Sequence, residues 1–251
     1  MSRAVLSVVC TDPVLWHPGP VTDTPPRTAR ERARAQITAE IVEAARRQLA
    51  TEGAAALSLR AVARELGMVS SAVYRYFPSR DHLLTRLIID AYNGVGDAVE
   101  AAEARRPRGD HVGRWMAVAR TTRDWALAHP HEWTLLYGSP VPGYAAPPDT
   151  IGPGTRVSLT MTRVLFDALE AGVLPDPEPV PRKVSRSIAP LRAFLPVDVP
   201  DSHLIAGLMA RTQVFGHISL ELDGQFTNSV DDLDAFFDHV ALTTSRQIGL
   251  S

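Results

Sequence analysis

The chain has 251 residues, enough for one large domain or two small ones, and its 45% hydrophobic content is typical of a globular protein with a real core. Its single cysteine, Cys10, excludes an internal disulfide and a cysteine metal cluster. No apolar run approaches the ~18 residues that a membrane-spanning helix needs, so we expect no membrane segment and a place in the reducing cytoplasm.

The formal net charge is -2, but the charge is unevenly distributed along the chain. Between Arg27 and Arg86, eleven arginines stand against six acidic residues, a net of +5. From Leu87 onward the net is -6. A basic block followed by an acidic remainder favours an anionic partner for the first block only.

The N-terminal part predicts a leader followed by four helices. Residues 1–29 hold five prolines and no sustained periodicity, which indicates a flexible leader or a misplaced start codon. Apolar residues at helical spacing then predict a helix over about 32–51. Ser58 and Gly67 bracket a second, short helix, 70–77 forms a third before Pro78, and Ser79 caps a longer one reaching about 104.

Two short helices joined by a tight glycine turn predict a helix-turn-helix, whose second helix can enter a DNA major groove. On a helical wheel Val73 and Phe77 lie together and face inward, with Val69 nearby. Ser71 and Arg75 point the opposite way, and their hydroxyl and guanidinium groups can donate to phosphates or base edges.

The run from 37 to 84, ITAEIVEAARRQLATEGAAALSLRAVARELGMVSSAVYRYFPSRDHLL, resembles the tetracycline-repressor (TetR) family of bacterial regulators. The resemblance implies a DNA-binding domain over 30–84 that continues into a connecting helix, with these DNA-contacting positions: Arg60, Ser70, Ser71, Ala72, Tyr74, Arg75, Tyr76 and Arg80. By the same resemblance, Arg80 stands where the family usually has a phosphate-gripping lysine.

Several of these residues have alternative interpretations. Tyr74 or Tyr76 could cap the core of the small domain, with Tyr76 nearer the apolar face, and Arg75 could be an ordinary solvated charge. The arginines at 30, 32 and 34 form either a solvated helix start or an arm that touches DNA.

The remainder, 105–251, predicts a second, larger helical domain. Helices are expected over about 111–129, 131–137, 157–171, 201–222 and 230–247. Twelve of the twenty prolines lie between Pro140 and Pro200, which predicts two long irregular connections, 138–152 and 174–199. No alternating strand pattern persists, so the predicted class is all-α. The segments HPHEWTLLYGSPVPGY and FGHISLELDGQF resemble a C-terminal domain found in actinobacterial members of the family, although His217 follows Gly216 here where the subgroup has a His-Gly pair.

By this resemblance the second domain binds a ligand and forms a homodimer through helices 201–222 and 230–247. Their apolar residues include Leu204, Leu208, Phe215, Leu222, Leu233, Phe236, Phe237 and Val240. Candidates for the ligand pocket are aromatic, Met and His residues, with core packing as the alternative for each: Trp115, Trp133, Tyr137, Met161, Phe166, Met209, Phe215 and His217. The connection 138–152 is long enough to cover such a pocket.

No catalytic motif and no cofactor site is recognisable, and His217 with Glu221 supplies only two of the ligands that a metal needs. We therefore expect a repressor that a small lipophilic effector releases from a palindromic operator. The alternative is an all-α small-molecule-binding protein or enzyme with a vestigial helix-turn-helix.

Overall fold

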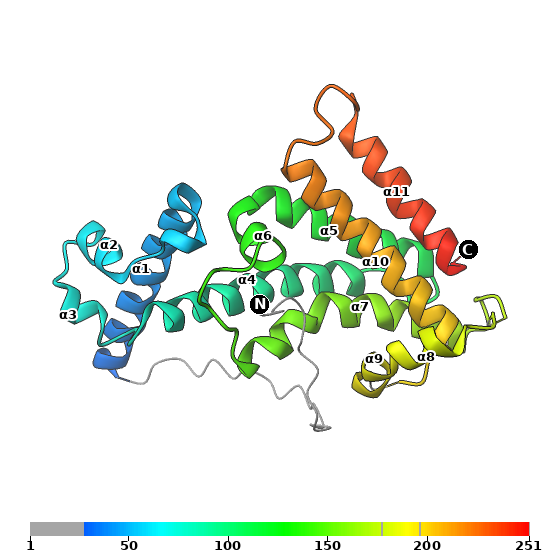
Figure 1. Ribbon diagram of the computed structural model, residues 1–251, viewed down its shortest axis with the longest axis horizontal. Helices are drawn as coiled ribbons and strands as arrows, with labels where there is room; N and C mark the ends of the chain where they lie inside the picture. The colour runs from blue at the N-terminus through cyan, green and yellow to red at the C-terminus, as the bar shows by residue number, and fades with distance from the viewer. Residues whose placement is uncertain (1–27, 177, 196, 251) are drawn as a thin grey trace.

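The computed structural model describes residues 28–176, 178–195 and 197–250, and within these ranges it consists of α-helices and short 3-10 turns without a β-strand (Figure 1). The predicted all-α class is confirmed. Of the predicted leader, 1–29, only the last two residues are among those described, and they begin the first helix. No helix in the described ranges is long and apolar enough to cross a membrane.

The N-terminal unit is formed by α1 (Ala29–Glu52), α2 (Leu59–Glu65), α3 (Ser70–Val73) and the start of α4 (Arg80–Ala104). A short 3-10 turn, η1 (Ala54–Ala56), links the first two helices. These elements enclose a small core: Ile41, Val42, Ala44, Ala45, Leu57, Leu59, Val62, Ala63, Val73, Phe77, Leu83, Leu84, Leu87 and Ile88.

Local sequence sets the helix boundaries of this unit. Thr28 and Glu31 form a reciprocal capping box, in which each backbone N–H donates to the other residue's side chain, so α1 begins earlier than the predicted residue 32. The Ser79 hydroxyl accepts from the His82 N–H at the start of α4, as predicted for a capping serine.

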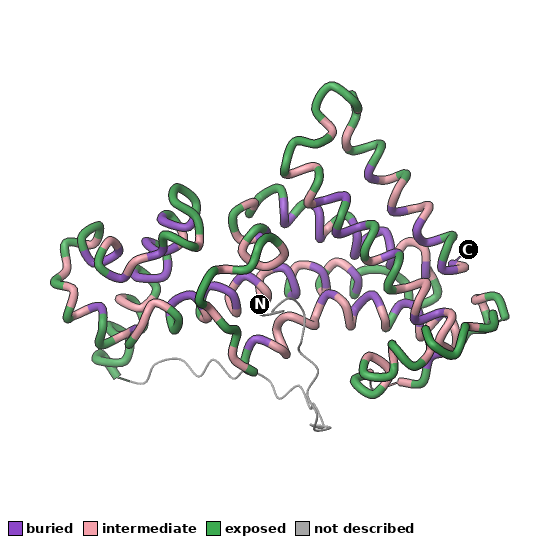
Figure 2. The backbone as a smooth tube through the Cα atoms, in the orientation of Figure 1, coloured by how far each residue is buried: buried purple, intermediate pink, exposed green. Residues whose placement is uncertain are grey.

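The C-terminal body contains α5 (His111–Ala128), α6 (Pro130–Tyr137), α7 (Ile151–Glu170), α10 (Asp201–Leu222) and α11 (Leu233–Ile248). Its core is built around buried Trp115, Trp133 and Phe237, and Figure 2 shows the buried positions of α5, α7 and α10 facing one another. Pro130 begins α6 at a position where a missing N–H costs nothing, immediately after α5 ends.

A single helix, α4, belongs to both cores. Its first turns contribute Leu84 and Leu87 to the N-terminal unit, and its later turns contribute Val95 and Val99 to the body. Figure 1 shows α4 running from the N-terminal unit into the body, beside α7.

Three predicted segments differ in the structure. The helix expected from 157 begins at Ile151, because Pro153 lies in the first turn, where a helix tolerates proline. The connection 174–199 is not irregular throughout, since it holds α8 (Arg182–Ser187) and α9 (Ala189–Phe194). The third helix, expected over 70–77, is α-helical only to Val73 and continues as a tighter turn, in which the Tyr76 N–H bonds to the Val73 carbonyl at 2.9 Å.

Candidate functional site

The sequence predicts two groups of functional residues, one for DNA contacts and one for a ligand pocket. The first group is centred on α3. Val73 and Phe77 are buried in the small core, as the helical wheel predicted. Ser71, Tyr74 and Arg75 are exposed on the opposite side. The segment is thus anchored by apolar side chains and presents a hydroxyl, a phenol and a guanidinium to solvent.

Val69 is placed differently from its prediction. It was expected near the inward face, but it precedes the first turn of α3 in an extended conformation and is 71% exposed. An exposed valine beside Ser70 therefore extends the presented surface with an apolar group. The wheel missed it because Val69 is the N-cap residue rather than part of the helix.

Tyr76 takes an intermediate position. It is partly buried against the small core, and the Arg34 guanidinium carbon lies 5.1 Å from its ring centroid. Arg34 also donates to the Arg75 carbonyl at 3.4 Å, so α1 supports the turn that follows α3. Arg60 on α2 is exposed, whereas Ser70 and Ala72 are half-buried.

Arg80 has partners that the sequence did not predict. Its guanidinium donates to the carbonyls of Ala54 at 2.8 Å, Leu57 at 3.1 Å and Ala55 at 3.2 Å. These bonds attach the start of α4 to η1. A phosphate contact by Arg80 would have to use Nη1, which lies 3.7 Å from the Asp81 carboxylate.

The second group is an aromatic cluster formed by Tyr92, Trp133, Tyr137 and Phe215. The ring centroids of Trp133, Tyr137 and Phe215 lie 4.4–5.4 Å from one another, and Tyr92 meets Tyr137 edge-on at 6.0 Å. The Trp133 indole donates to the Ser219 hydroxyl at 3.1 Å. Of the eight predicted pocket residues, these contacts bring together Trp133, Tyr137 and Phe215.

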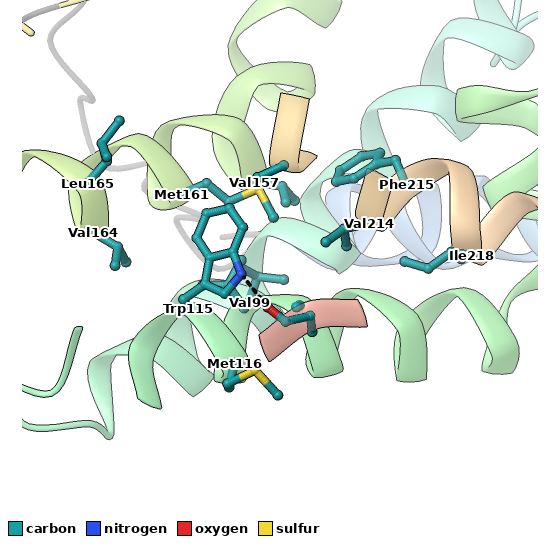
Figure 3. Close-up of a cluster of buried hydrophobic side chains, with 14 of the residues drawn as sticks. Val99, Trp115, Met116, Val157, Met161, Val164, Leu165, Val214, Phe215 and Ile218 are labelled. Carbon is teal, nitrogen blue, oxygen red and sulfur yellow. Dashed lines mark hydrogen bonds between the residues drawn. The ribbon is translucent and has the colours of Figure 1, made fainter. Parts of the chain in front are cut away.

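Trp115 lies in the main core of the body. Its indole nitrogen donates to the Ala241 carbonyl and to the Thr244 hydroxyl, both at 3.1 Å, and Figure 3 draws a bond from Trp115 toward α11 as a dashed line. Met161 is buried in the same core, and Phe166 packs against it while remaining partly exposed. A satisfied indole that is 1% exposed fits the core-packing alternative.

Met209 does not line the aromatic cluster. It is 59% exposed on the outer face of α10, one position from the exposed Leu208. The sequence pattern placed it inside because α10 carries apolar residues on more than one face.

His217 is buried among a separate set of rings. Its ring lies 4.7–5.3 Å from the rings of Phe226, Phe236 and Phe237, and burial lowers its pKa from the ordinary value, opposed by the Glu221 carboxylate. Glu221 is engaged by Arg123 in a bidentate pair at 2.7 and 2.8 Å. Among the described residues, no group of three His, Cys, Asp or Glu side chains is placed to hold a metal ion.

The predicted cover, 138–152, packs against the N-terminal unit. Val141 and Tyr144 pack on the small core, and the Tyr144 hydroxyl is 2.9 Å from the Thr85 hydroxyl on α4. Burial raises the pKa of Tyr144.

Helix α6 contacts both the aromatic cluster and the N-terminal unit. It supplies Trp133 to the cluster, while its Glu132 carboxylate pairs with the Arg46 guanidinium of α1 at 3.1 Å. Leu135 packs against the small core and Leu136 against both cores. This arrangement could not be predicted from the sequence, because Arg46 and Glu132 are far apart in the chain.

Comparisons with known proteins agree with this architecture. Residues 41–87 match the family model of bacterial regulatory proteins of the tetR family, and residues 115–243 match that of the tetracyclin repressor-like C-terminal domain. The HTH-type transcriptional regulator Rv1816 of Mycobacterium tuberculosis H37Rv is 44% identical over 217 residues, covering 83% of this chain and 91% of the relative.

Solved structures give the same result. The regulatory protein SCO4313 is 38% identical, with a TM-score of 0.71, covering 86% of this chain and 98% of that one. A Rhodococcus sp. RHA1 protein of unknown function, 22% identical with a TM-score of 0.62 over 84% of this chain and 93% of its own, shares the fold. The chain belongs to the tetR family of bacterial transcriptional regulators.

Proposed function

We propose that this protein is a ligand-responsive repressor that binds a palindromic DNA operator as a homodimer and is released by a small effector. The observation that carries the proposal is the presented face of α3 and the turn after it, where Ser71, Tyr74 and Arg75 are exposed over buried Val73 and Phe77. The net charge of +5 between Arg27 and Arg86 favours a polyanion at this unit. Because the proposed partner is DNA, we place the protein in the cytoplasm, and its proposed role is not catalytic.

In the complex, α3 lies in a major groove, and different side chains contact bases and phosphates. Arg75 donates to a guanine edge, while the hydroxyls of Ser70, Ser71 and Tyr74 bind phosphates or bases. Ala72 allows the helix to approach closely, and exposed Val69 meets a thymine methyl group. The remaining predicted positions, Arg60, Tyr76 and Arg80, lie at the border of this surface.

Arginine 75 gives the test of DNA binding. An operator is selected from a randomised duplex library, and its affinity is measured by fluorescence anisotropy over a range of salt concentrations. Arg75→Ala is expected to lower specific affinity by about 1–3 kcal/mol and to relax the preference at one base pair. Arg105→Ala, an exposed arginine at the far end of α4, is the matched control and leaves the affinity unchanged. If Arg75→Ala binds the operator as tightly as Arg105→Ala does, α3 is not the recognition element.

The dimer surface that we propose is the outer face of α10 and α11. Leu208, Met209, Leu220 and Phe236 are exposed there, and Gly216 between them has open space around it. This corrects part of the sequence expectation, since Leu204, Phe215 and Phe237 are buried in the subunit's own core. A two-fold axis through this face gives two copies of α3, and therefore a palindromic operator.

Effector binding at the aromatic cluster changes DNA affinity through α6. A molecule inserted beside Trp133 displaces this helix, and α6 is attached to α1 by the Glu132–Arg46 pair and by Leu135. The effector shifts the equilibrium only by its different affinity for the two arrangements.

A screen of small lipophilic molecules tests the sensing half of this proposal. An effector is expected to quench tryptophan emission and to release operator in the same concentration range. Trp133→Phe weakens both responses while ligand-free operator binding persists. If the protein binds operator but no molecule in the screen releases it, the proposed effector response is wrong and only the DNA-binding function remains. Tight ligand binding without salt-dependent duplex binding would favour the alternative, a small-molecule-binding protein with a vestigial helix-turn-helix.

A further inference from the structure

Three arginines of the C-terminal body lie wholly or partly away from water, with Arg114 and Arg123 buried and Arg156 half-buried. Each of them meets two carboxylates within 3.0 Å: Arg114 with Glu103 and Asp167, Arg123 with Glu221 and Asp234, and Arg156 with Asp97 and Glu100. Such pairing is required because a charge removed from water without a partner is costly.

Arg211 on α10 departs from this pattern. Its Nε atom is buried and has no hydrogen-bond partner, and its guanidinium carbon lies 4.4 Å from the centroid of the Phe215 ring. In the part of the chain that the structure describes, Arg211 forms no ion pair with a carboxylate. Arg211 is half-buried, and stacking on an aromatic face compensates only part of what its charge loses on partial burial.

The neighbours of Arg211 are the phenols of the aromatic cluster. Its positive charge acts on both Tyr92 and Tyr137, since in each case it lowers a pKa that burial raises. The net shift is upward for both, so both phenols remain neutral and keep a proton that they can donate. One unpaired cation and two O–H donors therefore lie at the edge of an apolar, ring-lined region.

We infer that Arg211 is the anion-binding group of the effector site, and that the effector is a small organic monocarboxylate with an aromatic or aliphatic body. The carboxylate accepts from Arg211 and from a tyrosine hydroxyl, while the apolar body inserts among Trp133, Tyr137 and Phe215. This inference rests on the proposed function, and it replaces a merely lipophilic effector with an amphipathic one. A single cation among rings suits one negative charge rather than a phosphate's two.

Stability without any ligand gives the first test. Arg211→Met keeps the aliphatic stem and removes the unpaired charge, so the melting temperature is expected to rise. Arg123→Met is the matched control, because the same change leaves two carboxylates without their cation and the melting temperature falls. A fall in both variants would indicate that Arg211 has an internal partner, and would overturn the inference.

Binding of defined acids gives the second test, with octanoate and phenylacetate as probes and their methyl esters as neutral counterparts. Each acid is expected to raise the melting temperature of the wild type, and the acids are expected to bind Arg211→Met about ten to a hundred times more weakly, as loss of a charge-assisted hydrogen bond implies. The esters bind both proteins weakly and to the same extent.

The outcomes separate this inference from the proposed function. If the acids bind Arg211→Met as tightly as the wild type, or the esters bind as tightly as the acids, the inferred anion site is wrong. A neutral effector that releases operator would in that case still support the proposed sensing function. If the acids bind through Arg211 but do not release operator, the anion site stands and the coupling through α6 is wrong.

Discussion

At the scale of single residues, burial separates the polar side chains that form hydrogen bonds inside the protein from the exposed ones that can bind DNA. Ser71 on α3 and Arg75 in the turn after it are exposed, and within the described residues neither side chain has a hydrogen-bond partner. Arg80, by contrast, uses its donors on backbone carbonyls, although the sequence alone suggested a phosphate contact. The difference could not be predicted, because the carbonyls come from η1, more than twenty positions away.

Arg80 leads to a prediction about stability. Arg80→Ala leaves three carbonyls without their donor and is expected to lower the free energy of unfolding by about 1–2 kcal/mol, measured by urea denaturation. Arg80→Lys restores part of this, since lysine can donate to one or two of the carbonyls but not with a planar fork. If unfolding were unchanged and only the salt dependence of DNA binding fell by about one unit, Arg80 would be a phosphate contact after all.

His217 leads to a prediction about pH. Burial lowers its pKa in the folded protein, whereas the unfolded chain titrates near 6.5. Above that pH both states are neutral and the full stability is present. As pH falls from 6.5 toward the folded pKa, only the unfolded state takes up a proton, so stability is lost.

His217→Gln is therefore expected to show a smaller loss of stability below pH 6.5 than the wild type, in urea unfolding curves recorded at several pH values. His239→Gln, an exposed histidine on α11, is the control and keeps the wild-type pH profile. Two identical profiles for His217→Gln and wild type would show that His217 is not the responsible group.

At the scale of elements, helix ends determine how the segments meet. Gly249 ends α11 with a φ of 96°, and the turn that it makes lets the Leu250 N–H bond to the Ser245 carbonyl at 3.0 Å and buries Leu250. A Cβ atom on Gly249 would lie 2.3 Å from Cδ of Pro175. The end of α11 is thus fitted against the connection that follows α7.

Gly249→Ala combines an unfavourable φ with this clash. We expect the free energy of unfolding to fall by about 2–3 kcal/mol in urea denaturation. Gly172→Ala has the same sign of φ, at 66°, but open space around it, so its cost should be only about 1 kcal/mol. Equal costs for the two variants would show that the contact with Pro175 is not maintained in solution.

The sequence predicted long amphipathic helices better than short segments. The bounds of α4, α5 and α10 are close to those predicted, because periodicity and capping residues act locally. The end of α3 and the helices α8 and α9 were missed, because helices of a few residues depend on contacts with the rest of the fold. The pocket candidates are divided among four places for the same reason, since composition cannot say which rings meet.

At the scale of the whole molecule, the N-terminal unit and the body are connected in three ways. They share α4, they are linked by the ion pair between Arg46 and Glu132, and Tyr144 fastens the 138–152 connection to Thr85. Helices α10 and α11, which carry the proposed dimer surface, lie at the opposite end of the molecule from α3 (Figure 1). DNA binding and assembly therefore use different surfaces of one subunit.

This separation allows assembly to be tested without touching the DNA-binding surface. Leu208→Asp is expected to give a folded monomer in sedimentation at micromolar concentration, with much weaker operator binding, because a charge is placed in the proposed interface. Leu127→Asp is the matched control, since Leu127 on α5 is 41% exposed and Leu208 is 42% exposed. A wild type that sediments as a monomer would remove the proposed dimer.

The continuity of α4 also restricts how such a protein can be recombined with its relatives. Because no loop separates the two cores along this helix, a chimera that exchanges the N-terminal unit must be joined within consecutive helical turns. An α-helix turns by about 100° per residue, so a junction longer by two residues would swing the grafted unit through roughly 200° around the axis of α4. An insertion of seven residues, close to two full turns, would nearly restore its direction while moving it outward by about 10 Å. In a symmetric pair, a change in the length of α4 would thus alter both the direction in which each α3 points and the distance between the two α3 helices. The length of α4 would therefore determine the spacing of the half-sites that the dimer can bind.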